Sequence, residues 1–180
     1  CRSISYALNC RAGDHDTILV AQGTYTENLI VDNGVTLMGG FEPTGWTRDI
    51  ALYETIVDGS QAGSVVVFNA GSDEAVLDGF TITGGIAEAG GGISIEEASP
   101  TIISSIITGN TAAIAGGGIY VRNGSPWITG NTITANTTDQ WRRILTQHLR
   151  VVGSDGEGDH YPWKVFVNQF TGERVTPATR

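Results

Sequence analysis

Lysine is nearly absent from this chain: Lys164 is the only one in 180 residues, and it lies near the C-terminal end. Residues 1–138 contain four arginines, no lysine and 14 acidic residues, a net charge of −10, whereas residues 139–180 carry +1. An acidic surface without lysine repels phosphate backbones, so the composition argues against nucleic-acid binding. The chain also lacks an apolar run of 18 residues, so we expect no membrane span.

Cysteine is scarce as well, with only Cys1 and Cys10. The segment SISYALNCRA (residues 3–12) has apolar residues at helical spacing and Ser3 as an N-cap, which predicts a short helix. A helix containing both cysteines would hold them on the order of 13 Å apart, too far for a disulfide. Two unpaired thiols, or a link to a segment outside this chain, are both open. Because the chain begins at Cys1 without a charged and then apolar leader, we interpret it as a fragment or a processed chain.

Good helix formers are also few, while Gly, Thr, Ser and Asn are abundant. One stretch of the sequence is nearly repeated. GGGISIEEASPTIISSIITGNTA (residues 90–112) returns as GGGIYVRNGSPWITGNTITANTT (residues 116–138). Five matched pairs, each 26 residues apart, are Ile93 and Ile119, Ser99 and Ser125, Pro100 and Pro126, Ile102 and Ile128, and Asn110 and Asn136.

The repeat extends backwards through shorter, β-branched segments. One series, with spacings of 26, 25, 20 and 20, runs through Ile128, Ile102, Leu77, Val57 and Leu37. A second runs through Ile82, Ile107 and Ile133, and a third through SVVVF, GGISI and GGIYV. Segments of three to five residues between Gly, Asn and Ser-Pro turns are too short for helices.

This pattern predicts an all-β parallel solenoid of about five coils over residues 1–138, with the helix at about residues 3–12 as an N-terminal cap. Like strands stack in register, while variable turns change the period. The alternating aliphatic residues face inward, since their burial holds coil on coil. Asn110 and Asn136 end equivalent strands, where Asn tolerates the left-handed conformation and stacked Asn side chains can bond to each other.

The opening segment, with GDHDTILVAQGTYTE, and the recurrent LDGFTITGG, GGGI, SPTI and ITGN resemble right-handed parallel β-helix proteins of the pectate-lyase-like superfamily. The likeness covers residues 1–138 and is strongest to bacterial secreted or surface β-helix repeat proteins. It implies a right-handed solenoid, as the usual hand of parallel crossovers also does, and an extracellular or cell-surface location. The inserted pair in GDHDTI departs from the family pattern. Enzymes of the superfamily act on acidic polysaccharides, through clustered carboxylates with calcium and an Arg or Lys base, or through paired carboxylates.

Asp58 and Asp78 are the first candidate catalytic residues. If the 20-residue spacing marks successive coils, their carboxyl groups would stack about 5 Å apart, near the spacing of a retaining glycosidase pair. Both also precede Gly, and Asp-Gly is a strong turn dipeptide, so a structural role is the competing interpretation.

Glu96 and Arg122 are the second candidates. They differ by 26 residues and should therefore lie side by side. A carboxylate beside an arginine could bind calcium and serve as a base, or could form a solvated cross-strand ion pair worth under about 1 kcal/mol. We expect no other metal site.

Tyr120 and Trp127 should both point outward, because Ile119, Val121 and Ile128 point inward. Flat aromatic rings beside Thr and Asn suit stacking against sugars. The alternative is that another part of the chain covers them.

Residues 139–180 break the repeat and change in composition. Two interpretations are open, a C-terminal cap or an extension foreign to the fold, and we favour the second. The acidic stretch GSDGEGDH in this tail lacks the glutamate that a calcium-binding loop needs.

These observations favour a fragment of a secreted or cell-surface β-helix protein, a non-catalytic structural, adhesion or carbohydrate-contacting module. Its expected partners are a polysaccharide or cell-surface glycan and further coils of a longer chain. A polysaccharide lyase or glycoside hydrolase is the alternative.

Overall fold

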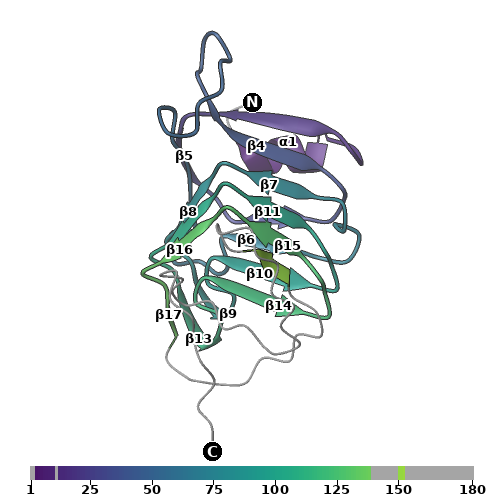
Figure 1. The fold of residues 1–180 in the computed structure, drawn as a ribbon, viewed down its shortest axis with the longest axis vertical. Helices are drawn as coiled ribbons and strands as arrows, with labels where there is room; N and C mark the ends of the chain where they lie inside the picture. The colour runs from purple at the N-terminus through teal and green to yellow at the C-terminus, as the bar shows by residue number, and fades with distance from the viewer. Residues whose placement is uncertain (1–2, 11, 139–149, 153–180) are drawn as a thin grey trace, which may run out of the picture.

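The computed structural model describes residues 3–10, 12–138 and 150–152, in which the regular secondary structure is short β-strands and one helix (Figure 1). All strands that pair in ladders run parallel. The one helix among the described residues is α1 (Ile4–Cys10). No helix in this part of the chain has the length and apolar character to cross a membrane. The prediction of an all-β fold with a short N-terminal helix is confirmed.

Two sheets contain most of the strands. Sheet A consists, in hydrogen-bonded order, of β1 (Thr17–Ala21), β4 (Thr36–Phe41), β7 (Val76–Asp78), β11 (Thr101–Ile103), β15 (Trp127–Thr129) and β18 (Arg150–Val152). Sheet B consists of β2 (Gly23–Thr26), β5 (Thr55–Asp58), β8 (Thr81–Thr83), β12 (Ile106–Thr108) and β16 (Thr132–Thr134).

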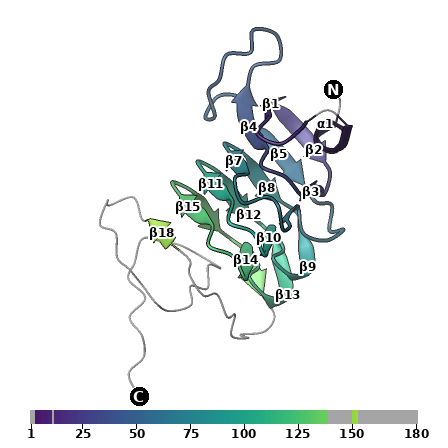
Figure 2. The ribbon, with the colours of Figure 1, turned by 90° about the vertical axis from the view of Figure 1, so that its right-hand side faces the viewer.

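Two smaller sheets complete the structure. Sheet C consists of β3 (Leu29–Val31), β6 (Val66–Phe68), β10 (Ile93–Glu96) and β14 (Ile119–Arg122). Sheet D consists of β9 (Ile86–Ala89), β13 (Thr111–Ala115) and β17 (Thr137–Thr138). Consecutive strands of the chain enter successive sheets and then return to sheet A beside an earlier strand. This path is compatible with a parallel β-helix (Figures 1 and 2).

The 26-residue repeat is confirmed by the strand register. Ile93 pairs with Ile119 in sheet C, and Ile102 pairs with Ile128 in sheet A. The second predicted series also forms a ladder, in which Ile107 pairs with both Ile82 and Ile133 in sheet B.

The position predicted for Val57 is wrong. Leu37 pairs directly with Leu77 in sheet A, whereas Val57 pairs with Tyr25 and Ile82 in sheet B. The physical reason is the long connection 42–54 between β4 and β5, which makes this turn of the chain much longer than the later ones. A spacing of 20 residues therefore does not mark one turn here.

β18 adds a strand to sheet A beyond residue 138, through pairing of Trp127, Ile128 and Thr129 with Arg150, Val151 and Val152. The other residues of the 139–180 segment, and the choice between a cap and a foreign extension, lie outside the described residues.

The core is a column of inward-facing, mostly aliphatic side chains, and buried polar side chains lie beside it at several places. Asn110 and Asn136 are both buried, and Nδ2 of Asn110 lies 3.0 Å from Oδ1 of Asn136. The predicted Asn stacking is confirmed. The left-handed residues of these turns are Gly109 and Ala135, one place before each Asn, so the conformation predicted for Asn is wrong.

Helix α1 lies at the N-terminal end of the stack of strands, as Figure 2 shows, and packs on β1 and β3 through Ile4, Ala7 and Leu8. Ser3 caps it as predicted, since Ser3 Oγ accepts a hydrogen bond of 3.1 Å from the Tyr6 amide. Burial of each large side chain contributes about 1.5–3 kcal/mol.

Glu27, which follows β2, fastens this helix to the strands. Its carboxylate accepts hydrogen bonds from Ser3 Oγ (3.0 Å) and from the amides of Ile4 (3.0 Å) and Ser5 (2.8 Å). Burial by itself would raise the pKa of this carboxyl. The hydrogen bonds from Ser5, Ile4 and Ser3 have the larger combined effect, so the pKa lies below its ordinary value of 4.5. The carboxylate thus satisfies amides that the first helical turn leaves without partners.

Glu27→Gln is expected to lower the free energy of unfolding at neutral pH by about 1 kcal/mol, allowing for solvent screening. Because the folded-state pKa is depressed, the carboxylate stabilises the fold above pH 4.5, and this stabilisation is lost as the pH falls through the folded-state pKa. Urea unfolding measured from neutral pH into acid should therefore show the free energies of unfolding of the variant and the parent becoming equal in acid. Glu42→Gln is the control, since the Glu42 carboxylate accepts from Thr44 within its own loop. A difference in the free energy of unfolding between the parent and Glu27→Gln that stays constant with pH would contradict the prediction.

Candidate functional site

Glu96 and Arg122 lie side by side on the outer face of sheet C, as predicted. β10 and β14 pair in a register that sets Glu96 against Arg122, and Arg122 Nη2 forms an ion pair with Glu96 Oε2. The side chains are 40% and 52% exposed, so solvent screens the pair. The hydrogen bond that Arg122 donates to the Glu96 carboxylate raises the pKa of the Arg122 guanidinium. The pair is a fixed polar contact on an exposed surface.

The same face carries a polar row that the repeat did not predict. Asp32 and Asn69 follow β3 and β6 by one residue each, and Asn69 Nδ2 donates to Asp32 Oδ1 at 2.7 Å. Because Val31 pairs with Phe68 and Phe68 with Ile95, the row continues from Asn69 to Glu96. Its members, in stacking order, are Asp32, Asn69, Glu96 and Arg122. Adjacent members are about 4.8 Å apart along the stack.

A second row runs parallel to the polar one and ends in the predicted aromatic residue. The register aligns Ile30 with Val67, Val67 with Ser94, and Ser94 with Tyr120. Tyr120 points outward, because Ile119 and Val121 on either side of it are buried. The outer face of sheet C therefore holds two parallel rows, one polar and one mostly apolar. Tyr120 and Arg122 are neighbours at one end.

Trp127 also points outward, but it belongs to a different sheet. It lies in β15 of sheet A, in register with Thr101, and its side chain is exposed. The two aromatic residues therefore do not form one patch on a single sheet.

The predicted stacking of Asp58 on Asp78 is wrong. Asp58 lies in sheet B in register with Thr83, and its Oδ1 accepts from the Ser60 amide at 2.8 Å. Asp78 lies in sheet A in register with Met38 and Ile103. Both strands end in Asp-Gly, and this shared turn chemistry made them look equivalent in sequence.

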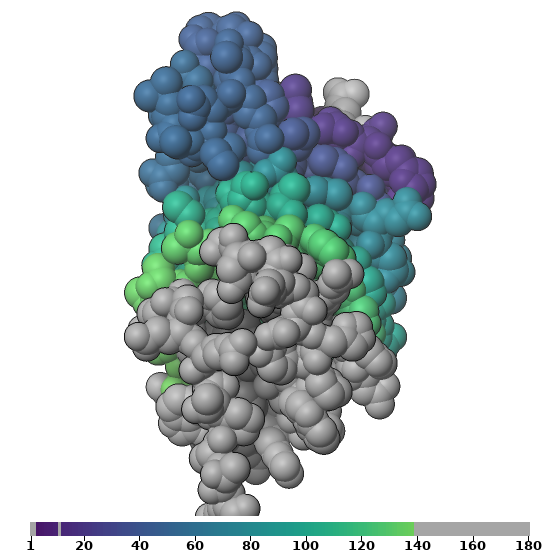
Figure 3. Space-filling view, in the orientation of Figure 1, coloured from purple at the N-terminus to yellow at the C-terminus, as the bar shows by residue number. Residues whose placement is uncertain are grey.

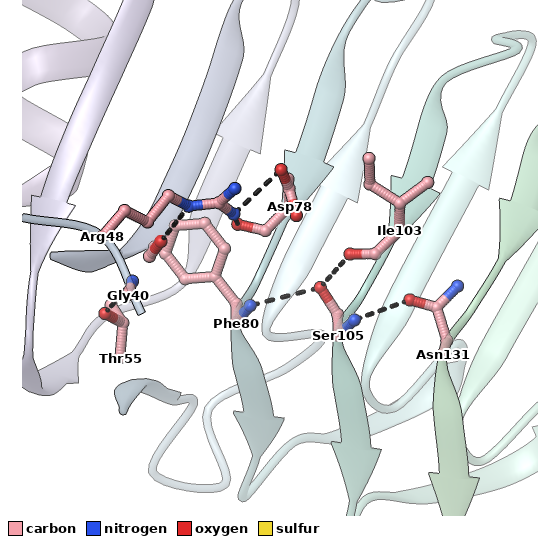
Figure 4. A network of polar contacts seen from close by, with 9 residues as sticks. Gly40, Arg48, Thr55, Asp78, Phe80, Ile103, Ser105 and Asn131 are labelled. Carbon is pink, nitrogen blue, oxygen red and sulfur yellow. Dashed lines mark hydrogen bonds and ion pairs between the residues drawn. The ribbon is translucent and has the colours of Figure 1, made fainter. Parts of the chain in front are cut away.

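Asp78 has a different partner, which the sequence did not reveal. Arg48 Nη2 lies 2.8 Å from Asp78 Oδ2, and Arg48 Nε donates to the Gly39 carbonyl oxygen at 2.9 Å (Figure 4). The Arg48 guanidinium also lies over the Phe41 ring, 5.8 Å from its centroid. Asp78 is mostly buried and fixes the 42–54 connection to sheet A. No spacing rule could pair these residues, because Arg48 lies in the irregular connection.

In the described part of the chain, no three His, Cys, Asp or Glu side chains gather as a metal site would require. The carboxylate of Glu96, considered above as a calcium ligand, pairs with Arg122. Cys10 is exposed at the end of α1, while Cys1 and the acidic stretch 153–160 lie outside the described residues.

Comparison of the chain with protein-family models, curated proteins and solved structures yields no significant match. The fold and the arrangement of the described side chains therefore carry the functional argument.

Proposed function

We propose that this chain is part of a secreted or cell-surface protein of the right-handed parallel β-helix class, similar to the pectate-lyase-like superfamily, with about five coils. In this proposal the chain has no catalytic role, and the outer face of sheet C binds polysaccharide. The parallel strands, the chain path through the sheets and the motifs of residues 1–138 support the class. Right-handed crossovers are the rule for parallel connections.

One observation carries the binding proposal: Tyr120 lies two residues from Arg122 on the same outward face, and Arg122 is held by Glu96. An aromatic ring supplies a flat apolar surface for a sugar ring. The neighbouring amide, carboxylate and guanidinium groups can exchange hydrogen bonds with hydroxyls. These donors and acceptors are held by their pairing, so little conformational entropy is lost on binding.

The charge of this face favours an uncharged glycan. The polar row carries two carboxylates, Asp32 and Glu96, and one guanidinium, and the whole chain has a net charge of −9. A polyuronate would be repelled unless cations screened it. A neutral polysaccharide meets no such barrier.

Calorimetric titration of the full 180-residue chain with neutral and acidic oligosaccharides, with and without calcium, tests the proposal. Tyr120→Ala is expected to weaken binding of a neutral oligosaccharide by several-fold to about tenfold, on the order of 1 kcal/mol of aromatic contact. Arg122→Gln should weaken it by less, because the guanidinium is exposed to solvent.

Tyr6→Ala is the matched control, since Tyr6 is an exposed tyrosine on α1 and not on sheet C. Equal losses for the Tyr6 and Tyr120 variants, or no binding of any oligosaccharide, would reject the proposal. Release of unsaturated or reducing sugar ends during the titration would instead support the lyase or hydrolase alternative.

A further inference from the structure

The connection between β4 and β5, residues 42–54, exposes an unusual amount of apolar surface. Trp46, Ile50 and Leu52 are 50%, 43% and 67% exposed. The loop projects beyond the sheets at the N-terminal end of the molecule (Figures 1 and 3). Exposed apolar patches on proteins commonly mark contact surfaces.

Hydrogen bonds and an ion pair hold this loop in one shape. Arg48 ties its centre to Gly39 and Asp78 (Figure 4). Asp49 Oδ1 accepts from the amides of Ala51 (3.0 Å) and Leu52 (3.1 Å), and the Asp49 amide donates to the Gly40 carbonyl oxygen at 2.8 Å.

Two of these apolar side chains, Trp46 and Ile50, pack partly against neighbouring residues. The Trp46 ring lies 6.2 Å from the Phe41 ring at 51°, and Ile50 packs beside Gly40 and Gly79, where a Cβ would collide with it. One side of Trp46 and of Ile50 is therefore held, and the other side faces solvent. A surface fixed in this way loses little entropy when a partner binds.

The charge around the apolar centre is negative. The loop contains Glu42, Asp49 and Glu54, and its single cation, Arg48, pairs with Asp78. Apolar side chains among carboxylates of the same loop are complementary to a segment that carries apolar side chains between lysines or arginines. Such a loop is repelled by an anionic lipid surface.

We propose that residues 42–54 form a docking site for a basic, apolar segment of a partner protein, with Trp46 and Leu52 as the anchoring side chains. The site is separate from the glycan-contacting face of sheet C and does not depend on it.

Fluorescence anisotropy with the full chain and a labelled peptide of alternating lysine and leucine tests this proposal. Trp46→Ala and Leu52→Ala are each expected to weaken binding by about tenfold or more, and added salt should weaken it further. The matched control is Ile30→Ala, which removes an exposed aliphatic side chain from sheet C. A peptide of alternating glutamate and leucine should bind far more weakly.

Several results would overturn the proposal. Equal affinity of the Ile30, Trp46 and Leu52 variants for the lysine peptide would mean that net charge alone attracts it. Absence of binding, or preference for the glutamate peptide or for phosphatidylglycerol vesicles, would exclude a basic protein segment. Sedimentation that shows a dimer dissociated by Trp46→Ala would identify a second copy of the chain as the occupant. Unchanged thermal unfolding of the Trp46 and Leu52 variants, whose side chains are exposed, separates lost docking from lost folding.

Discussion

Asn110→Ala is expected to lower the free energy of unfolding by about 3–5 kcal/mol. The buried amide of Asn110 accepts from the Gly85 amide at 2.9 Å, and its Nδ2 faces oxygens of Ile82, Thr108 and Asn136 at 3.0–3.1 Å. Alanine removes all of these contacts and leaves the Gly85 N–H without its partner in a site closed to water, which alone costs about 1–3 kcal/mol. Chemical denaturation followed by circular dichroism measures the loss.

Asn131→Ala provides the matched control, because Asn131 has the same kind of role at a more exposed turn. Its Oδ1 accepts from the Ser105 amide at 2.9 Å, and its Nδ2 donates to the Ile102 carbonyl oxygen at 2.8 Å. Water can replace these bonds in part, so we expect a loss of about 1–2 kcal/mol. Equal losses of unfolding free energy at the two positions would show that burial does not set how strongly these Asn side chains stabilise the turns.

Gly91→Ala is expected to cost about 3 kcal/mol or more, above the range usual for an overpacked core. A Cβ at this position would overlap the carbonyl oxygen of Thr111, which belongs to the neighbouring strand β13. Backbone cannot rotate away as a side chain can, so the two turns of the chain would have to separate. The expected result is a large fall in the melting temperature or failure to fold, measured by differential scanning calorimetry.

Gly13→Ala is the comparison for this substitution. The nearest atom to a Cβ at Gly13 is Asp16 Oδ2 at 3.5 Å, an ordinary contact, and the residue is exposed. Reduced entropy of the unfolded chain should leave the Gly13 variant unchanged or stabilised by under about 1 kcal/mol. Similar melting temperatures for the Gly91 variant and the parent would mean that the strands can shift apart freely.

The repeated sequence predicted the register wherever successive turns of the chain have nearly equal length. The 26-residue offset predicted that Glu96 lies beside Arg122 and Asn110 beside Asn136. When parallel strands stack without bulges, residues one repeat apart become neighbours in adjacent strands. The GGG triplets of this repeat lie where the structure brings backbones so close together that no side chain fits. Hydrophobic alternation gave the inward and outward faces.

Prediction failed where the length of a turn changed. Because the 42–54 loop lengthens one turn of the chain, Val57 and Asp58 lie in sheet B and not in sheet A. No local pattern in the sequence revealed the length of this turn. Asp32 and Asn69 were missed for the same reason, since the spacings between early strands differ from 26. The ion pair of Arg48 with Asp78 joins an irregular loop to a strand, and such a pairing has no period to detect.

The packing of α1 on β1 and β3 protects the first turn of the stack of strands. At the N-terminal end, Ile4 and Leu8 fill the end of the core, and Glu27 holds the helix in place. Each turn of such a stack is stabilised mainly by its neighbours, so the least protected turn opens first. Opening of the first turn would therefore also require α1 to leave β1 and β3 and to break its hydrogen bonds with Glu27, so local opening at this end is coupled to unfolding of the helix.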